Sequence, residues 1–257
     1  MHDLLPKGAN GTYEGEFTEE DPKSGELLNQ SVRTKPGELY TRKLKVVCDR
    51  CNNEWMSRIE EAIIPTLTSI IQGKRVTLDA AELKSLSHWA TLKSIVLEHG
   101  NGSKDHVTPL KDRMAFAFEG TIPSYFSIYF LSHASASEIG YVRTSHAISL
   151  TSGPPTPPLE DRVKNVQQIS VMLGRAMLHV NAAYVDGFRI EDRLDMPKVI
   201  ERRIWPPNQI PLSWPAEPFL TTNQMRDLAY AMERVTALPQ VKRGGDLLNS
   251  PQPESRR

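Results

Sequence analysis

The sequence predicts an α+β fold in which helices pack on an antiparallel sheet. Apolar residues recur at helical spacing between residues 52 and 120, whereas residues 126–180 hold runs of β-branched and aromatic residues. The composition, with 39% hydrophobic and 24% charged residues, is that of an ordinary globular protein. The length of 257 residues allows one large domain or two small ones.

The overall charge gives no support for a protein that depends mainly on phosphate contacts. Lys plus Arg and Asp plus Glu each total 31, so the formal net charge is zero. No apolar run approaches the ~20 residues needed to cross a bilayer. The N-terminus also lacks the basic and apolar regions of a signal peptide. We therefore expect a cytoplasmic protein whose cysteines are reduced thiols.

The first part of the chain is expected to hold an irregular acidic lead-in, residues 8–25, followed by a hairpin. The hairpin arms are Leu27–Arg33 and Leu39–Val47, joined by a turn with Pro36 and Gly37 at its centre. The second arm alternates in polarity, as a strand does. Its basic residues indicate either a solvated strand face or a phosphate-facing surface, and the sequence leaves both open.

The first predicted helix begins at Asn52 or Asn53, because asparagine is a favourable N-cap. Its apolar face has i, i+4 spacing and consists of Trp55, Ile59, Ile63, Leu67 and Ile71. Pro65 predicts a kink or a break. A second helix is expected from Asp79 to His99, and a shorter one from Pro109 to Phe118.

The predicted strands are Phe126–Leu131, Gly140–Thr151 and Val166–Val180, with Gly174 dividing the last run or marking a bulge. Residues 154–158 form a stiff Pro-rich loop between strands. A Pro- and Trp-rich segment after residue 204 is expected to wrap over the core, and a last helix follows Thr222. The domain prediction is a partial metal-binding region at 1–72, an α+β domain at 73–240 and a disordered tail at 241–257.

The two cysteines of the chain, Cys48 and Cys51, form a Cys-x-x-Cys pair between a strand-like run and a helix. This spacing lets two sulfurs bind one metal ion, but a structural zinc site needs four ligands. The pair is therefore half of a zinc site. Two other interpretations stay open, namely small buried residues and a redox pair at a helix start, although no βαβ pattern surrounds it.

The order hairpin, Cys-x-x-Cys-Asn-x-x-Trp, then a helix beginning Met-Ser-x-x-Glu resembles the second half of HNH-type (ββα-metal) endonucleases of bacteria and phages. The resemblance covers Leu39–Ile71 well and the later Trp-Pro pairs loosely. It implies an N-terminal partial ββα-metal unit with a zinc knuckle, and metal-dependent hydrolysis of DNA phosphodiester bonds.

Carried over by position, Cys48 and Cys51 would bind a structural Zn²⁺. Asn52 would help to hold a catalytic Mg²⁺ or Mn²⁺, with Asn53 as the fallback and the better N-cap. DNA is the partner that the resemblance implies.

The family pattern also has an earlier Cys-x-x-Cys and a Glu-His-x-x-Pro-like motif, which this chain lacks. The only histidine upstream is His2, whose spacing to Pro6 does not fit. We therefore expect a truncated or degenerate homologue, weak or inactive as a nuclease by itself, with the missing motifs encoded in frame upstream. The alternative is a non-catalytic nucleic-acid- or protein-binding module with a vestigial knuckle.

The remaining histidines offer two further groupings. His99 and His106 are expected to approach each other across the turn at residues 100–105, and His133, His146 and His179 lie on or beside predicted strands. Core and surface histidines are far commoner than metal ligands, so neither grouping by itself predicts a metal site.

Overall fold

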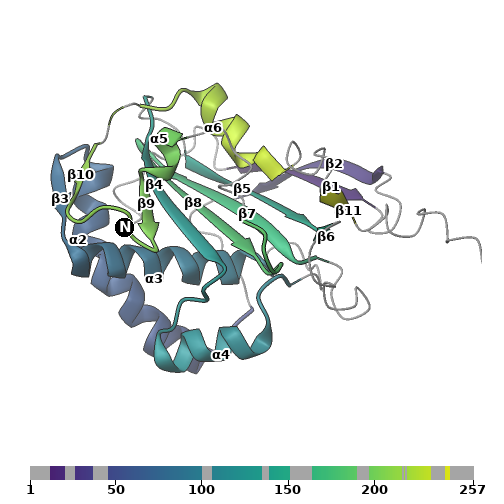
Figure 1. Cartoon of the computed structure of the whole chain (residues 1–257), viewed down its shortest axis with the longest axis horizontal. Helices are drawn as coiled ribbons and strands as arrows, with labels where there is room; N and C mark the ends of the chain where they lie inside the picture. Colours follow the sequence, from purple (N-terminus) through teal and green to yellow (C-terminus); the bar gives the residue numbers. More distant parts are fainter. Residues whose placement is uncertain are drawn as a thin grey trace, which may run out of the picture.

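The computed structural model describes residues 12–20, 27–36, 46–99, 106–134, 139–150, 164–189, 197–215, 217, 219–232 and 241–243. These form an α+β structure, as predicted, around a five-stranded antiparallel sheet (Figure 1). The strand order is β5 (Ile139–His146), β7 (Val166–Leu173), β8 (Ala176–Ala183), β4 (Phe126–Ser132) and β9 (Arg203–Trp205).

The hairpin of β7 and β8 forms the centre of this sheet, and Gly174 makes its turn. Leu173 is paired with Ala176, and Gly174 has φ +63°, a conformation that glycine adopts without steric cost. The predicted division of residues 166–180 at Gly174 is therefore confirmed. The strand predicted over residues 140–151 is two strands, β5 and β6 (Ile148–Leu150).

Both faces of the sheet are buried, because helices cover each side (Figure 1). Ile128 and Phe130 of β4 belong to a core cluster with α2 (Ser57–Ile71) and α3 (Ala80–Leu97). Tyr129 and Leu131 point the other way, into a cluster with α5 (Pro197–Ile200) and α6 (Thr222–Ala229). Period-two alternation along one strand thus supplies two cores.

Several helices begin or end where local signals predict. Asp79 caps α3 through a capping box with Glu82, and Thr221 caps α6 in the same way with Gln224. The short helix α4 (Leu110–Glu119) ends at Gly120, which has φ +68°.

The structure shows no break at Pro65, since α2 runs through it as one helix. Pro65 and Glu61, one turn earlier, both lie on the exposed side of α2. The carbonyl group that loses its partner therefore faces solvent, where the loss is least costly.

The lead-in expected to be irregular over residues 8–25 is corrected by the structure. The strand β2 (Leu27–Pro36) pairs in antiparallel fashion with β1 (Thr12–Glu20), which lies within that stretch. The second arm of the predicted hairpin, Leu39–Val47, falls almost entirely outside the described residues. The sequence of β1 has four glutamates and no basic residue, whereas β2 carries Arg33 and Lys35 and no acidic residue. Residues 37–45 lie outside the described part.

The Pro- and Trp-rich segment extends the fold at its edges, as expected. The strand β9 pairs with β4, and β10 (Leu212–Trp214) pairs with β3 (Val76–Leu78). Trp214 is buried and stacks on Phe130, with ring centroids 6.0 Å apart. Trp214 therefore contributes to the core and not to a contact surface. Three peptide bonds before proline in this segment are cis.

The predicted domain boundary between residues 72 and 73 falls between two helices that share one core cluster. Leu67 and Ile70 of α2 and Leu83 and Leu86 of α3 belong to this cluster. In the predicted tail, β11 (Val241–Arg243) pairs with β6, and residues 244–257 lie outside the described part. No helix among the described residues is long and apolar enough to cross a membrane.

Candidate functional site

The helix that carries the knuckle begins at Cys48 and not at Asn52 or Asn53, which corrects the predicted start. Cys48 is the N-cap, with an extended backbone, and its sulfur accepts a hydrogen bond from the Cys51 N–H at 3.2 Å. The Asn52 N–H donates to the Cys48 carbonyl oxygen at 3.0 Å. A thiol therefore takes the capping role that the sequence assigned to an asparagine.

The pKa values of the two thiols are shifted in opposite directions. Hydrogen bonds from the Cys51 thiol and backbone N–H lower the pKa of the Cys48 thiol, which is fully exposed. The same contact raises the pKa of the Cys51 thiol, although a hydrogen bond with the Trp55 side chain opposes this effect. The thiolate is the form that attacks and that binds metals, so Cys48 is the more reactive partner.

The two asparagines lie inside the helix, in a π-helical segment, η3 (Asn52–Met56), which joins α1 (Asp49–Cys51) to α2. The hydroxyl group of Ser57 donates to the Asn52 carbonyl oxygen at 2.9 Å. Both asparagine side chains are exposed, and the Asn52 amide nitrogen donates to the Asn53 side-chain oxygen at 3.3 Å. This contact uses the Asn53 oxygen and leaves the Asn52 oxygen available.

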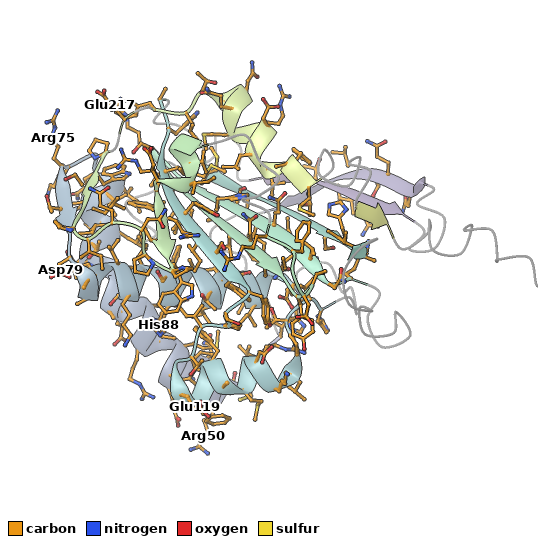
Figure 2. The ribbon with its side chains drawn as sticks, viewed as in Figure 1. Arg50, Arg75, Asp79, His88, Glu119 and Glu217 are labelled. Carbon is orange, nitrogen blue, oxygen red and sulfur yellow. The ribbon has the colours of Figure 1, made fainter. Side chains whose placement is uncertain are left out.

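The β1–β2 hairpin does not lie beside the knuckle. In Figure 1 the β1–β2 hairpin lies at the end of the molecule near β11, and Figure 2 places Arg50, next to the cysteines, at a different end. Within the described ranges, no three His, Cys, Asp or Glu side chains are grouped as a metal site would require. The structure therefore brings Cys48 and Cys51 together and adds no third ligand from the described part.

Of the two histidine groupings considered in the sequence, the structure brings together only one. His99 and His106 do meet, with ring centroids 4.1 Å apart. His133, His146 and His179 do not form a metal-ligand group. Instead His179 contacts the Ser170 hydroxyl group at 2.8 Å, and both residues are buried.

The environment of His99 keeps its ring neutral. The Arg113 guanidinium donates to the His99 Nε2 at 3.1 Å. Burial and the positive charges of His106, Arg113 and Arg143 lower the pKa of His99 to about 4.

A buried polar network lies beside this pair and was not predicted. The carboxyl group of Glu98 accepts hydrogen bonds from the Thr108 N–H at 3.2 Å, the Thr108 hydroxyl at 2.5 Å and the Gln167 amide at 2.5 Å. Burial raises the pKa of Glu98, and these hydrogen bonds and the charge of Arg143 oppose the rise. All three polar partners are buried, so the network joins α3, the start of α4 and β7 as a structural element.

A groove of about 330 Å³ lies between η3, α2, α3 and α4, within one helical turn of Asn52. Its floor is formed by Trp55, Ile59 and Phe116, and the ring centroids of Trp55 and Phe116 are 6.0 Å apart in an edge-on arrangement. Arg58 and Lys84 stand at its rim, both exposed.

His88 completes the groove and joins α3 to the end of α4 (Figure 2). Its Nδ1 lies 2.8 Å from the Lys84 carbonyl oxygen, and its Nε2 lies 2.8 Å from the Gly120 carbonyl oxygen. Carbonyl oxygens only accept hydrogen bonds, so both contacts are satisfied together only when each ring nitrogen carries a proton. No sequence signal indicated this groove, because its residues come from η3, α2, α3 and α4 and show no shared motif.

Comparison with known proteins gave no relative, because no protein-family model, curated protein or solved structure matches the chain. The assignment of a function therefore depends on the chemistry of the residues themselves.

Proposed function

We propose that this chain is a relative of the HNH endonucleases that binds zinc through Cys48 and Cys51 and hydrolyses DNA phosphodiester bonds with a divalent metal. The supporting observation is the thiol pair in the first turn of a helix, with Cys48 exposed and Cys51 partly buried, where the Cys51 N–H donates to the Cys48 sulfur. Backbone N–H groups that point at a sulfur stabilise its thiolate form. A reducing cytoplasm would keep both thiols ready for the metal.

The donor set fits half of a tetrahedral zinc site. Two thiolates are standard zinc ligands, and both sulfurs lie at a surface where further ligands can reach them. The described residues supply no third ligand. The remaining ligands would come from residues outside the described part, and with the thiol pair alone the chain would be weak or inactive as a nuclease.

Asn52 is the better of the two candidate ligands for the catalytic metal. Its side-chain oxygen is available, whereas the Asn53 oxygen already accepts from the Asn52 amide. Mg²⁺ and Mn²⁺ prefer oxygen ligands. When bound, such a metal stabilises the negative charge that develops on the scissile phosphate.

The zinc content of the purified protein tests the knuckle. Elemental analysis should find about one zinc per chain in a version extended by the upstream in-frame sequence. A C48S/C51S double variant of that version should lose the metal. The proposal would be contradicted if neither the given chain nor the extended version contained zinc. Stop codons directly upstream of the chain would also contradict it.

A plasmid-nicking assay with Mg²⁺ or Mn²⁺ tests the catalytic part. Nicking should fall strongly in Asn52→Ala and remain in Asn53→Ala, which is the matched neighbour on the same exposed surface. Equal loss in both variants, or no nicking by the zinc-loaded extended protein, would argue against this role for Asn52.

A second candidate is the non-catalytic binding module, and the basic groove beside Trp55 favours it. It predicts that the extended, zinc-loaded protein binds DNA without cutting it. Retained binding in the absence of any nicking would support this candidate over the nuclease.

A further inference from the structure

The groove between η3, α2, α3 and α4 lies directly beside the proposed metal site. Trp55 follows Asn52 within one helical turn, and Ile59 and Ala62 continue from it along one face of α2. A strand held at Asn52 would therefore reach the groove within a short distance.

We propose that this groove holds a nucleotide unit of a single-stranded nucleic acid, with the base against Trp55 and the phosphate on Arg58 and Lys84. The inference rests on the proposed nucleic-acid function and adds the place where an unpaired strand would bind. It applies to the nuclease and to the non-catalytic module alike.

The charge of the groove favours an anionic ligand. Three of its ten lining residues, Arg58, Lys84 and His88, are basic, and none is acidic. The His88 ring is held in place by contacts with the carbonyl oxygens of Lys84 and Gly120. This local surplus exists although the chain as a whole has a formal net charge of zero.

The shape and the floor favour a planar ring beside the anionic group. The volume of about 330 Å³ lies at the lower end of the ~300–1,000 Å³ typical of small-ligand sites, which suits one base with its sugar phosphate. Trp55 is half-buried, and Phe116 lies beneath it and packs its ring against that of His88 at 5.9 Å. Aromatic side chains in a basic groove are the usual platform for bases of single strands, since every base has a π-face.

An acidic peptide would share the charge preference but not the need for an aromatic ring. The predominance of aromatic groups on the floor is the observation that favours the nucleotide. Competition by polyglutamate separates the two ligands in the test.

The test is fluorescence anisotropy of a labelled oligothymidylate, titrated with the full chain in EDTA so that no metal-dependent cleavage occurs. Wild-type affinity should fall steeply between about 50 and 200 mM salt. Arg58→Ala and Lys84→Ala should each weaken binding and reduce the slope of log K against log salt by about 0.7. Trp55→Leu should weaken binding by about 5- to 150-fold.

The matched control is a Lys74→Ala/Arg75→Ala double variant, which removes two exposed charges at the other end of α2. Figure 2 places Arg75 far from His88 and Arg50. This variant should bind as the wild type does. Since Arg58 and Lys84 are exposed, their loss leaves the fold intact, which thermal unfolding verifies.

Three results would overturn the inference: unchanged binding in Arg58→Ala and Lys84→Ala, equal loss in the control, or tighter binding of polyglutamate than of the oligonucleotide. Groove binding is measured in EDTA and needs no metal, so it is read out separately from nicking. Failure of nicking with normal groove binding would therefore refute the nuclease alone, and normal nicking without groove binding would refute this inference alone.

Discussion

Replacing Thr108 by valine removes one hydrogen bond from the buried carboxyl group of Glu98 and little else. Threonine and valine side chains are nearly equal in shape, and both Thr108 and Glu98 are fully buried. The lost bond joins the Thr108 hydroxyl to Glu98 at 2.5 Å, while the bonds from the Thr108 N–H and from Gln167 remain. The variant therefore isolates one contact of the network.

The expected cost is about 2 kcal/mol, because hydrogen bonds to charged groups are worth roughly 1.5–3 kcal/mol. For a chain of this size the midpoint of thermal unfolding should fall by about 4–8 °C. The cost should also depend on pH. The hydrogen bond from Thr108 favours the ionised carboxyl group, so its loss raises the pKa of Glu98 further. Because the pKa of Glu98 is raised in the folded protein, the free energy of unfolding is higher at low pH and falls as the carboxyl group ionises with rising pH. This fall should be larger in the variant than in the wild type.

Urea unfolding at pH 4 and pH 8 measures both parts of this prediction. Thr66→Val is the control, because the Thr66 hydroxyl also contacts a glutamate, Glu82, but at 3.4 Å and only partly buried. It should cost less than about 0.5 kcal/mol. If Thr108→Val costs no more than Thr66→Val at pH 8, or costs more at pH 4 than at pH 8, the reasoning about the buried carboxyl group is refuted.

Three further predictions concern packing and protonation. As the pH drops from 6.5 towards the His99 pKa of about 4, the free energy of unfolding should fall by about 1 kcal/mol after allowance for solvent screening. The cause is that His99 takes up a proton in the unfolded chain at a higher pH than in the folded protein. In a series of urea unfolding measurements at different pH, His99→Gln should show a smaller fall over this range. Gly120→Ala should destabilise by about 1 kcal/mol in thermal unfolding, because φ is +68° there, whereas Gly140→Ala meets no neighbour and should not. Leu67→Ala should cost about 2–5 kcal/mol in urea unfolding because its side chain is fully buried, and Ile64→Ala, 39% exposed on the same helix, should cost much less.

The elements that were predicted correctly carry their signals within a few residues. The capping box of Asp79 and Glu82 begins α3, Gly120 ends α4, and Gly174 turns β7 into β8. Each of these signals acts on its own backbone through a hydrogen bond or an allowed dihedral angle. The meeting of His99 and His106 belongs here too, since only a short loop separates them.

The structure bears on the predicted site only in its most local part. The Cys-x-x-Cys spacing puts both thiols in one turn, but propensity chose an asparagine as the N-cap where the structure uses Cys48. A thiol is a weak acceptor and rarely chosen from propensity alone, so no sequence signal indicated this start. Zinc binding and the roles of Asn52 and Asn53 stay predictions.

By itself the sequence determined part of the local framework of this protein: the helices α3 and α4 with the capped start and the glycine end, the hairpin of β7 and β8, and the pair of thiols. Only the tertiary structure decided that β2 pairs with β1, that Glu98 bonds to Thr108 and Gln167, and that three helices enclose a basic groove beside Trp55. The reason is that the contacts of a buried carboxyl group, and the walls of a groove, are supplied by residues that are far apart in the sequence. Local propensity carries no information about which of these neighbours meet.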